Sequence, residues 1–308
     1  MLAFHLPPVA PMSENLRHVE VEGHRIAVLS RHEDRDTTPL ILLHGVALSP
    51  RIWTHILPPA LAGRRWHAVG LPAHHPSEAP PDFADRPMPP ELFGQGLAGV
   101  LAEIAGDRPC DLLGHSTGGY AALAIAAAAP ERVRSICAVS AFAQGEWNGG
   151  IGLLQAVARL DRLGGPLFGA GLGLMRSHPA IARLAALAAT NRPRACNAWP
   201  PLAPMLETVV ADLKRTDRTA LRHFMAAMHE HDIRDRLGAV RAPTLLVHGT
   251  ADPVVPFAQA RLIKYRVPHA QLERMAGIGH LPFGEAADRF EAILRQWYER
   301  FPDDRHEP

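Results

Sequence analysis

Short runs of consecutive apolar residues recur along this chain, separated by segments with helical spacing. The runs lie at 40–43, 66–69, 110–113, 133–139 and 243–247, and a more polar candidate strand follows at 271–275. The apolar runs are short and bounded by turn residues, which is typical of strands buried on both faces of a parallel sheet. Upstream, the stretch 16–30 alternates around Glu22 and Gly23, which predicts an antiparallel hairpin.

Helical periodicity fills the intervals between these predicted strands. Helices are expected at 91–105, 120–129, 257–265 and 290–301. Strands that alternate with helices at this spacing form βαβ units. We therefore predict an α/β fold with a mostly parallel central sheet flanked by helices.

The alternation breaks between Ala141 and Leu237, where only helical faces are found, such as those at 206–213 and 221–228. This pattern predicts a helical cap inserted into the core. The predicted organisation is a leader at 1–15, a core at 16–140 and 238–301, a cap at 141–237 and a polar tail at 302–308.

Composition and charge narrow the class of protein. The formal net charge is +1 without any basic run, which argues against nucleic acid or an anionic membrane surface as a partner. No apolar run approaches the ~18 residues of a spanning helix, and residues 1–12 lack the basic start of a secretory signal. Three cysteines cannot all pair, and Cys110 and Cys137 fall in predicted core strands. A cytoplasmic protein is expected, and its oligomeric state is left open.

A Gly-x-Ser-x-Gly pattern with a further glycine stands between the strand at 110–113 and the helix at 120–129. It reads Gly114, His115, Ser116, Thr117, Gly118 and Gly119. A serine that attacks a carbonyl must stand clear of the backbone on a turn so tight that its neighbours tolerate no side chain, and glycine meets that need. Ser116 is therefore the candidate nucleophile.

A serine hydroxyl needs a base to take its proton and a third group to orient that base. Asp252 follows the strand at 243–247, within Gly-Thr-Ala-Asp-Pro, and His280 follows the strand at 271–275, within Gly-His-Leu-Pro. Ser116, Asp252 and His280 are thus candidates for a catalytic triad of nucleophile, orienting acid and base, and they occur in this order along the chain. A turn aspartate and a loop histidine are the alternative readings of these two residues.

These motifs, together with His44-Gly45 after the strand at 40–43, resemble those of the α/β-hydrolase fold family over residues 16–301. The resemblance implies that Ser116 is the nucleophile, His280 the general base and then acid, and Asp252 the group that fixes the histidine tautomer. It also implies an oxyanion hole formed by the backbone N–H groups of Val46 and Thr117. The supporting residues are His44, Gly45, Gly114, His115 and Gly118.

The sequence departs from the family pattern after the strand at 66–69. Relatives carry Asp-x-x-Gly-x-Gly there, whereas this chain reads Gly70-Leu71-Pro72-Ala73-His74-His75. We expect this change to affect local packing and the site entrance, and His74 and His75 to lie in a solvated loop, because no other metal ligands stand at a suitable spacing. Glu146, after the strand at 133–139, is a rival to Asp252 as the acid.

The predicted activity is serine ester hydrolysis through an acyl-enzyme, without a cofactor or metal, on a small-molecule ester. Apolar residues of the cap predict a pocket for an apolar acyl or alcohol part, although some of them must instead form the core of the cap: Leu153, Leu154, Phe168, Met175, Trp199 and Met205. Carbon–carbon hydrolases, thioesterases, amidases and acyltransferases use the same triad. A ligand-binding protein that has lost turnover is a further alternative.

Overall fold

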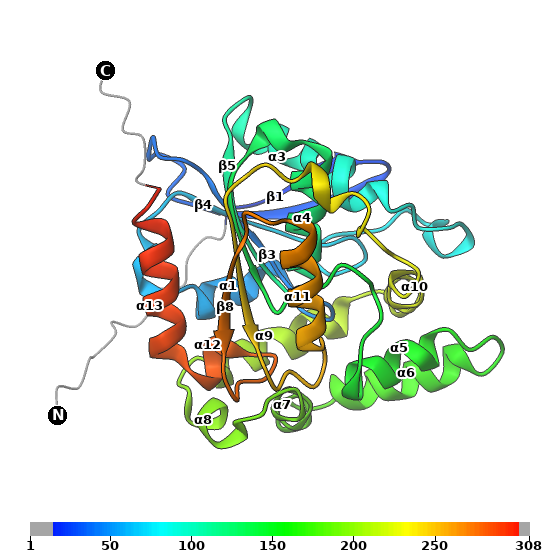
Figure 1. The fold of residues 1–308 in the computed structure, drawn as a ribbon. Coiled ribbons are helices and arrows are strands. Elements are labelled where there is room, and N and C mark those ends of the chain that lie inside the picture. The colour runs from blue at the N-terminus through cyan, green and yellow to red at the C-terminus, as the bar shows by residue number, and fades with distance from the viewer. Residues whose placement is uncertain (1–14, 302–308) are drawn as a thin grey trace.

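A computed structural model describes residues 15–301, in which an eight-stranded sheet forms the centre of the molecule (Figure 1). The predicted tail at 302–308, and the predicted leader apart from Asn15, lie outside the described residues. The strand order is β1-β2-β4-β3-β5-β6-β7-β8. The strands are β1 (Asn15–Val21), β2 (His24–Arg31), β3 (Leu40–Leu43), β4 (Trp66–Val69), β5 (Cys110–His115), β6 (Val133–Val139), β7 (Thr244–Gly249) and β8 (Gln271–Met275).

The sheet is parallel from β4 to β8, and only β1 and β2 run antiparallel to their neighbours. Every residue of β3, β4, β5 and β7 is buried, which explains their continuous apolar runs. Glu22 and Gly23 both take positive φ in the hairpin turn between β1 and β2. The α/β fold class predicted from the sequence is confirmed.

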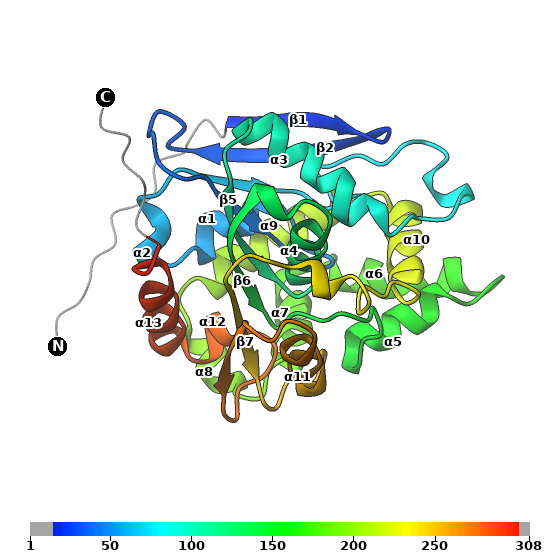
Figure 2. The same cartoon turned by 45° about the horizontal axis from the view of Figure 1, so that its top comes forward.

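Helices cover both faces of the sheet. Helices α1, α2 and α13 lie on one side and α3, α4 and α11 on the other, as a second view also shows (Figure 2). Their bounds are α1 (Trp53–Ile56), α2 (Pro59–Ala62), α3 (Leu97–Ala105), α4 (Thr117–Ala128), α11 (Phe257–Arg266), α12 (Pro282–Glu285) and α13 (Ala287–Tyr298). The central helix α4 has ten buried residues and packs against β5 and β6, so it is apolar all round.

The segment predicted as one helix over 91–105 has two parts. A π-helical turn, η3 (Leu92–Gly96), precedes α3. Gly94 faces α4 so closely that an added Cβ would stand 3.0 Å from Cβ of Ala128. Gly94 is therefore the position at which η3 and α4 approach each other, whereas Gly96 and Gly99 face Val21 of β1.

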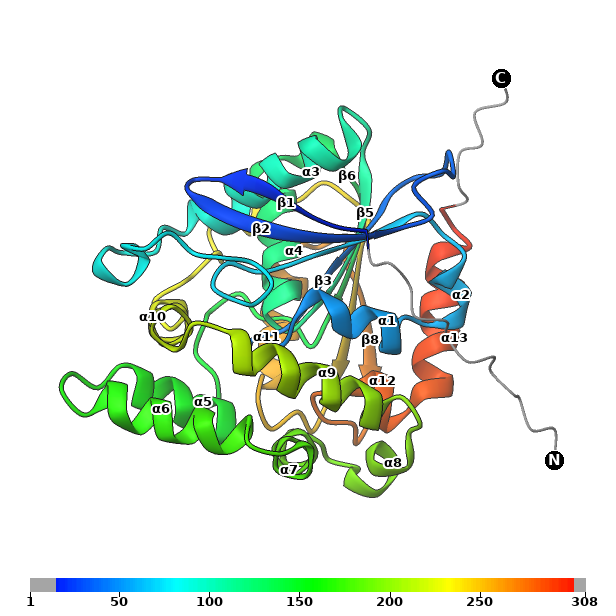
Figure 3. The same cartoon turned by 180° about the vertical axis from the view of Figure 1, so that it is seen from behind.

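Six helices lie between β6 and β7 in the sequence. They are α5 (Gly149–Ala158), α6 (Gly164–Met175), α7 (Pro179–Ala188), α8 (Pro193–Ala198), α9 (Leu202–Arg215) and α10 (Arg218–Met228). Figure 3 shows that α5 to α9 lie along the end of the sheet at which the parallel strands finish. We call α5–α10 the inserted helices. Within residues 15–301, no helix is long and apolar enough to cross a membrane.

Short 3-10 turns connect several of these elements. They are η1 (Pro50–Ile52), η2 (Phe83–Asp85), η4 (Pro130–Arg132) and η5 (Leu237–Ala239). Because the parallel strands end together at one edge of the sheet, the loops after β3, β5, β7 and β8 meet beneath the inserted helices. The three predicted triad residues, Ser116, Asp252 and His280, lie on the loops after β5, β7 and β8.

Candidate active site

Ser116 stands alone on the turn between β5 and α4, in a backbone conformation that few residues other than glycine adopt. Its φ is 55° and its ψ is −117°. A Cβ at Gly118 would collide with the carbonyl oxygen of Leu43, and one at Gly114 would collide with the carbonyl of Gly118. The glycines therefore let α4 pack directly against β3 and β5, and this close packing holds Ser116 in the strained conformation.

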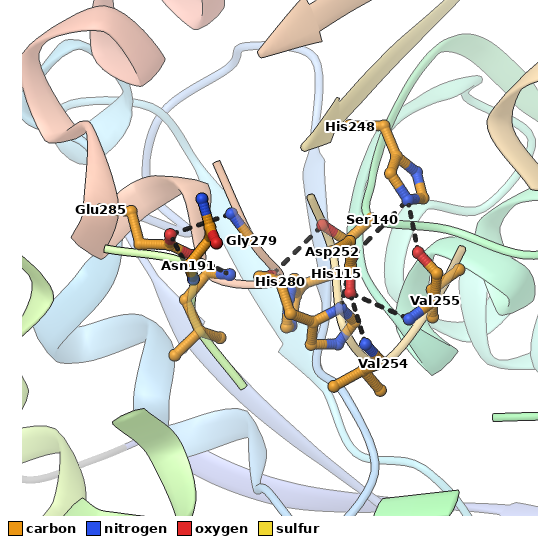
Figure 4. A network of polar contacts seen from close by, with 11 residues as sticks. His115, Ser140, Asn191, His248, Asp252, Val254, Val255, Gly279, His280 and Glu285 are labelled. Atoms are coloured by element: carbon orange, nitrogen blue, oxygen red, sulfur yellow. Dashed lines mark hydrogen bonds and ion pairs between the residues drawn. The ribbon is translucent and has the colours of Figure 1, made fainter. Parts of the chain in front are cut away.

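His280 and Asp252 lie side by side at the ends of β8 and β7. Nδ1 of His280 donates to Oδ2 of Asp252 at 2.8 Å, and both side chains are almost fully buried (Figure 4). This bond leaves Nε2 as the nitrogen of His280 that can accept a proton. Ser116 and His280 line the same cavity.

Asp252 is held as a carboxylate. Its Oδ1 accepts the N–H groups of Val254 at 2.8 Å and Val255 at 2.9 Å. Burial alone would raise the pKa of Asp252, but the neighbouring His280 and His248 and the Val255 N–H outweigh burial and hold this pKa below its usual value. Glu146, the rival acid, is exposed to solvent.

The backbone of His280 is fixed on both sides. Its carbonyl accepts hydrogen bonds from Nε2 of His115 at 3.0 Å and from the Ser140 hydroxyl at 3.2 Å, and its N–H donates to the carbonyl of Ala189 at the end of α7. Burial lowers the pKa of His115 to about 3, so this ring is neutral and donates from Nε2. The loop that carries His280 is thus attached to both the sheet and the inserted helices.

Glu285 is a positioning residue that the sequence analysis did not single out. Its carboxylate is buried and accepts the N–H groups of Gly279 and, from the segment after α7, Asn191 and Arg192, each at 2.9 Å (Figure 4). It therefore joins the His280 loop to the inserted helices. Glu285 lies five residues after His280 and ends the single turn of α12. In the sequence it looks like an ordinary acidic residue near a helix start, which is why the pattern gave no signal.

Two buried histidines shape the loop after β3. His44 donates from Nδ1 to the carbonyl of Gly45 at 2.8 Å, and its Nε2 accepts the N–H of Leu71 at 3.0 Å. His74 donates from Nδ1 to the carbonyl of Pro72 at 2.8 Å, and its Nε2 accepts the N–H of Ala47 at 3.0 Å. Each ring must remain neutral to accept an N–H, and burial accordingly lowers the pKa of His44 to about 3 and that of His74 to about 4.

The expectation that His74 lies in a solvated loop was wrong, because its side chain is 1% exposed and contacts the loop after β3. His75 is partly buried. The departure from the family pattern at Gly70 also has a structural counterpart, since a Cβ at Gly70 would collide with the Ser77 hydroxyl, which accepts the N–H of Ala27. The loop after β4 therefore supports the site.

The N–H groups of Val46 and Thr117 are the two predicted donors of the oxyanion hole. Thr117 is the first residue of α4, where helix N–H groups lack a partner within the helix. Within residues 15–301, neither of these two N–H groups donates a hydrogen bond to a backbone carbonyl. Val46 lies one residue before Ala47, whose positive φ of 58° is held by the bond to His74.

The cavity at Ser116 is almost entirely apolar. Its walls include Gly45, Val46, Ala47 and Leu48 from the loop after β3, and Met175, Met205, Leu206, Val209 and Leu213 from the inserted helices. Of the cap residues predicted to form the pocket, Met175 and Met205 line this cavity. Trp199 instead packs against Phe283, and Phe168 is only 1% exposed, in the core. Leu153 and Leu154 line a neighbouring groove. Among the described residues, no cluster of histidine, cysteine and acidic side chains could hold a metal ion.

The chain belongs to the alpha/beta hydrolase family, whose model matches residues 40–293. This match spans the sheet from β3 onward, the inserted helices and the four loops of the site.

Curated relatives and solved structures resemble the chain over most of its length. The chain is 28% identical over 284 residues to a pimeloyl-[acyl-carrier protein] methyl ester esterase of Neisseria meningitidis, covering 90% of this chain and 83% of that protein. The counterpart in Aeromonas hydrophila is 28% identical over 84% of this chain and 94% of its own length. A hydrolase from Pseudomonas aeruginosa has a TM-score of 0.70 at 22% identity, covering 93% and 99% of the two chains. An esterase from a Rhodococcus species has a TM-score of 0.66 at 23% identity, covering 94% and 100%.

Proposed function

We propose that this protein is a carboxylic ester hydrolase that acts through an acyl-enzyme on Ser116. The observation that carries the proposal is the arrangement of Ser116 and His280 on one apolar cavity, with Asp252 hydrogen-bonded to the far nitrogen of His280. The relatives named as methyl ester esterases act on the same class of bond.

The geometry supports a two-step reaction. Nε2 of His280 takes the proton of the Ser116 hydroxyl while Oγ bonds to the carbonyl carbon of the ester, and the N–H groups of Val46 and Thr117 stabilise the oxyanion. The C–O bond to the alcohol then breaks, and the alcohol leaves with the proton from Nε2. A water molecule, deprotonated by His280, attacks the acyl-enzyme, and the carboxylic acid leaves as Ser116 regains its proton.

The substrate of this proposal is a small molecule with an apolar acyl or alcohol part, because the cavity offers few polar partners besides Ser116 and the two histidines. Nothing in the reaction requires a cofactor or metal. A cytoplasmic location is also part of the proposal: Cys110, Cys137 and Cys196 are all unpaired thiols, as a reducing compartment would keep them.

The test is covalent labelling with a fluorophosphonate, followed by peptide mapping and an ester panel. We expect one adduct per chain on Ser116, none in Ser116→Ala, and turnover of 4-nitrophenyl acetate that Ser116→Ala abolishes. An adduct without ester turnover, but with turnover of thioesters or vinylogous diketones, would favour a thioesterase or a carbon–carbon hydrolase. No adduct on the folded protein would contradict the proposal and favour a ligand-binding role.

A further inference from the structure

A second apolar hollow adjoins the cavity at Ser116. It is a groove between α5, α6 and α7, and it shares lining residues with the cavity at its inner end: Ile151, Met175, Ala185, Ala189 and Val254. The cavity holds Ser116 and His280, whereas the groove holds neither. The two hollows therefore form one path that leads from Ser116 outward along the inserted helices.

The groove presents no polar side chain. All of its lining residues are glycine, alanine, valine, leucine, isoleucine or methionine. It has no side chain that could hydrogen-bond or pair with a polar or charged group, so only an apolar ligand gains by entering it.

Exposed leucines accompany the groove. Among the described residues, six of the seven exposed large hydrophobic side chains are leucines at 153–184, on α5, α6 and α7 and in the turn between α5 and α6. Three of them form the walls of the groove: Leu153, Leu167 and Leu174, which are 68%, 49% and 60% exposed. Such leucines gain contacts if a hydrocarbon chain lies between them.

We propose that the groove holds the distal part of a long hydrocarbon chain of the ester substrate, while the ester bond lies at Ser116. This inference rests on the proposed function and specifies its substrate class as long-chain esters. Continuity with the cavity favours a chain of the substrate over a segment of another protein, because the occupant then reaches the groove from the site of reaction. Burial of one methylene is worth up to a factor of about four in binding.

Two glycines of α6 offer a matched test of this path. Gly171 lines the groove, and an added Cβ there would stand 3.4 Å from Cδ1 of Leu154, which also lines it. At Gly173, two positions along the same helix, an added Cβ meets no atom within 4 Å, and this residue does not line the groove. A large side chain at 171 therefore fills the groove, and the same side chain at 173 points away from it.

The experiment compares kcat/KM for 4-nitrophenyl esters of 2 to 12 carbons, below their micellar concentrations. We expect kcat/KM to rise by about twofold to fourfold for each methylene that enters the groove. Gly171→Phe should lower the ratio of the 12-carbon to the 2-carbon ester at least tenfold, and Gly173→Phe should keep it. Acetates of alcohols of graded length, measured in parallel, show whether the acyl or the alcohol chain occupies the groove.

A second pair of variants tests the same inference in case Gly171→Phe disturbs folding. Leu167→Glu places a charge on the groove wall and should lower the same ratio, whereas Leu163→Glu, 67% exposed and outside the groove, should not. The inference is overturned if all four variants leave the ratio of kcat/KM for the 12-carbon and 2-carbon esters unchanged. If the 2-carbon ester is hydrolysed through Ser116, the proposed function survives that outcome; if no ester is hydrolysed, the proposed function itself fails.

Discussion

The loops at the ends of the strands and the inserted helices form opposite sides of one cavity, and they are held by different forces. The loops are fixed by directional hydrogen bonds: His280 to Asp252, His74 to Ala47, and Glu285 to Gly279. The face of the inserted helices that borders the groove is held by apolar contacts and leaves leucines exposed. A small displacement of a donor breaks a hydrogen bond, whereas apolar side chains repack with little loss.

This difference assigns separate tasks to the two regions. In the proposed function the loops fix the positions of the reacting atoms, and in the proposed long-chain specificity the inserted helices supply the apolar surface that recognises hydrocarbon. Substitutions in the loops should therefore change turnover or stability sharply, and those in the inserted helices should change chain-length preference.

The largest expected effect is that of Asp252→Asn. The amide would favour the wrong tautomer of His280, so kcat should fall by about 10⁴-fold, measured on 4-nitrophenyl acetate, while the fold remains intact by circular dichroism. Glu146→Gln is the matched control and should keep turnover, because Glu146 is exposed. Near-normal turnover of Asp252→Asn would assign the orienting acid to another residue.

A pair of glycine substitutions compares backbone packing in the two regions. Gly118→Ala brings a Cβ against the carbonyl oxygen of Leu43, so it should reduce the free energy of unfolding by about 3 kcal/mol or more. Gly173→Ala, in α6, meets open space and should increase that free energy by about 0.5–1 kcal/mol. Urea denaturation measures both, and equal effects of the two changes would contradict the comparison.

Acid should destabilise the protein through histidines that are buried in the neutral form. The pKa values of His44, His74 and His115 are lowered to about 3, 4 and 3 by burial, so below the unfolded value of 6.5 the unfolded chain binds protons that the native state does not. Stability is therefore lost as pH falls, by about 1 kcal/mol for each of these histidines between pH 6.5 and 5.5.

Urea denaturation at the two pH values measures this loss. His115→Gln should reduce this loss by about 1 kcal/mol, the contribution of one buried neutral histidine. A free energy of unfolding that is constant over this interval would show that these rings take up protons in the folded protein.

The sequence predicted those parts of the molecule whose structure depends on residues that are close together in the sequence. The buried strands and the turn at Ser116 follow from local runs, because a parallel strand and a tight turn each impose their own residue types. His74 and Glu285 were misjudged or missed, because their partners stand 27 residues away at Ala47 and 94 away at Asn191. Only the folded chain brings such pairs together.

The smallest effect we expect in the loops is that of His74→Phe. The substitution keeps the ring but removes the acceptor for the Ala47 N–H, which loosens the backbone next to Val46. Because an oxyanion is stabilised only in the transition state, kcat should fall by about tenfold with little change in KM. Burying an unpaired N–H should also cost about 1–3 kcal/mol of stability.

The control for this prediction is His67→Phe, which removes a buried histidine that is hydrogen-bonded to Ser30 in the sheet. Both variants should lose stability, but only His74→Phe should lower kcat. Stability alone cannot produce that split, so a fall in kcat confined to His74→Phe would make His74 a positioning residue for the oxyanion hole. An equal fall in kcat in both variants would mean that the hydrogen bond between His74 and Ala47 serves stability alone. The hydrogen bonds that position the catalytic groups would then be those of His280, Asp252 and Glu285.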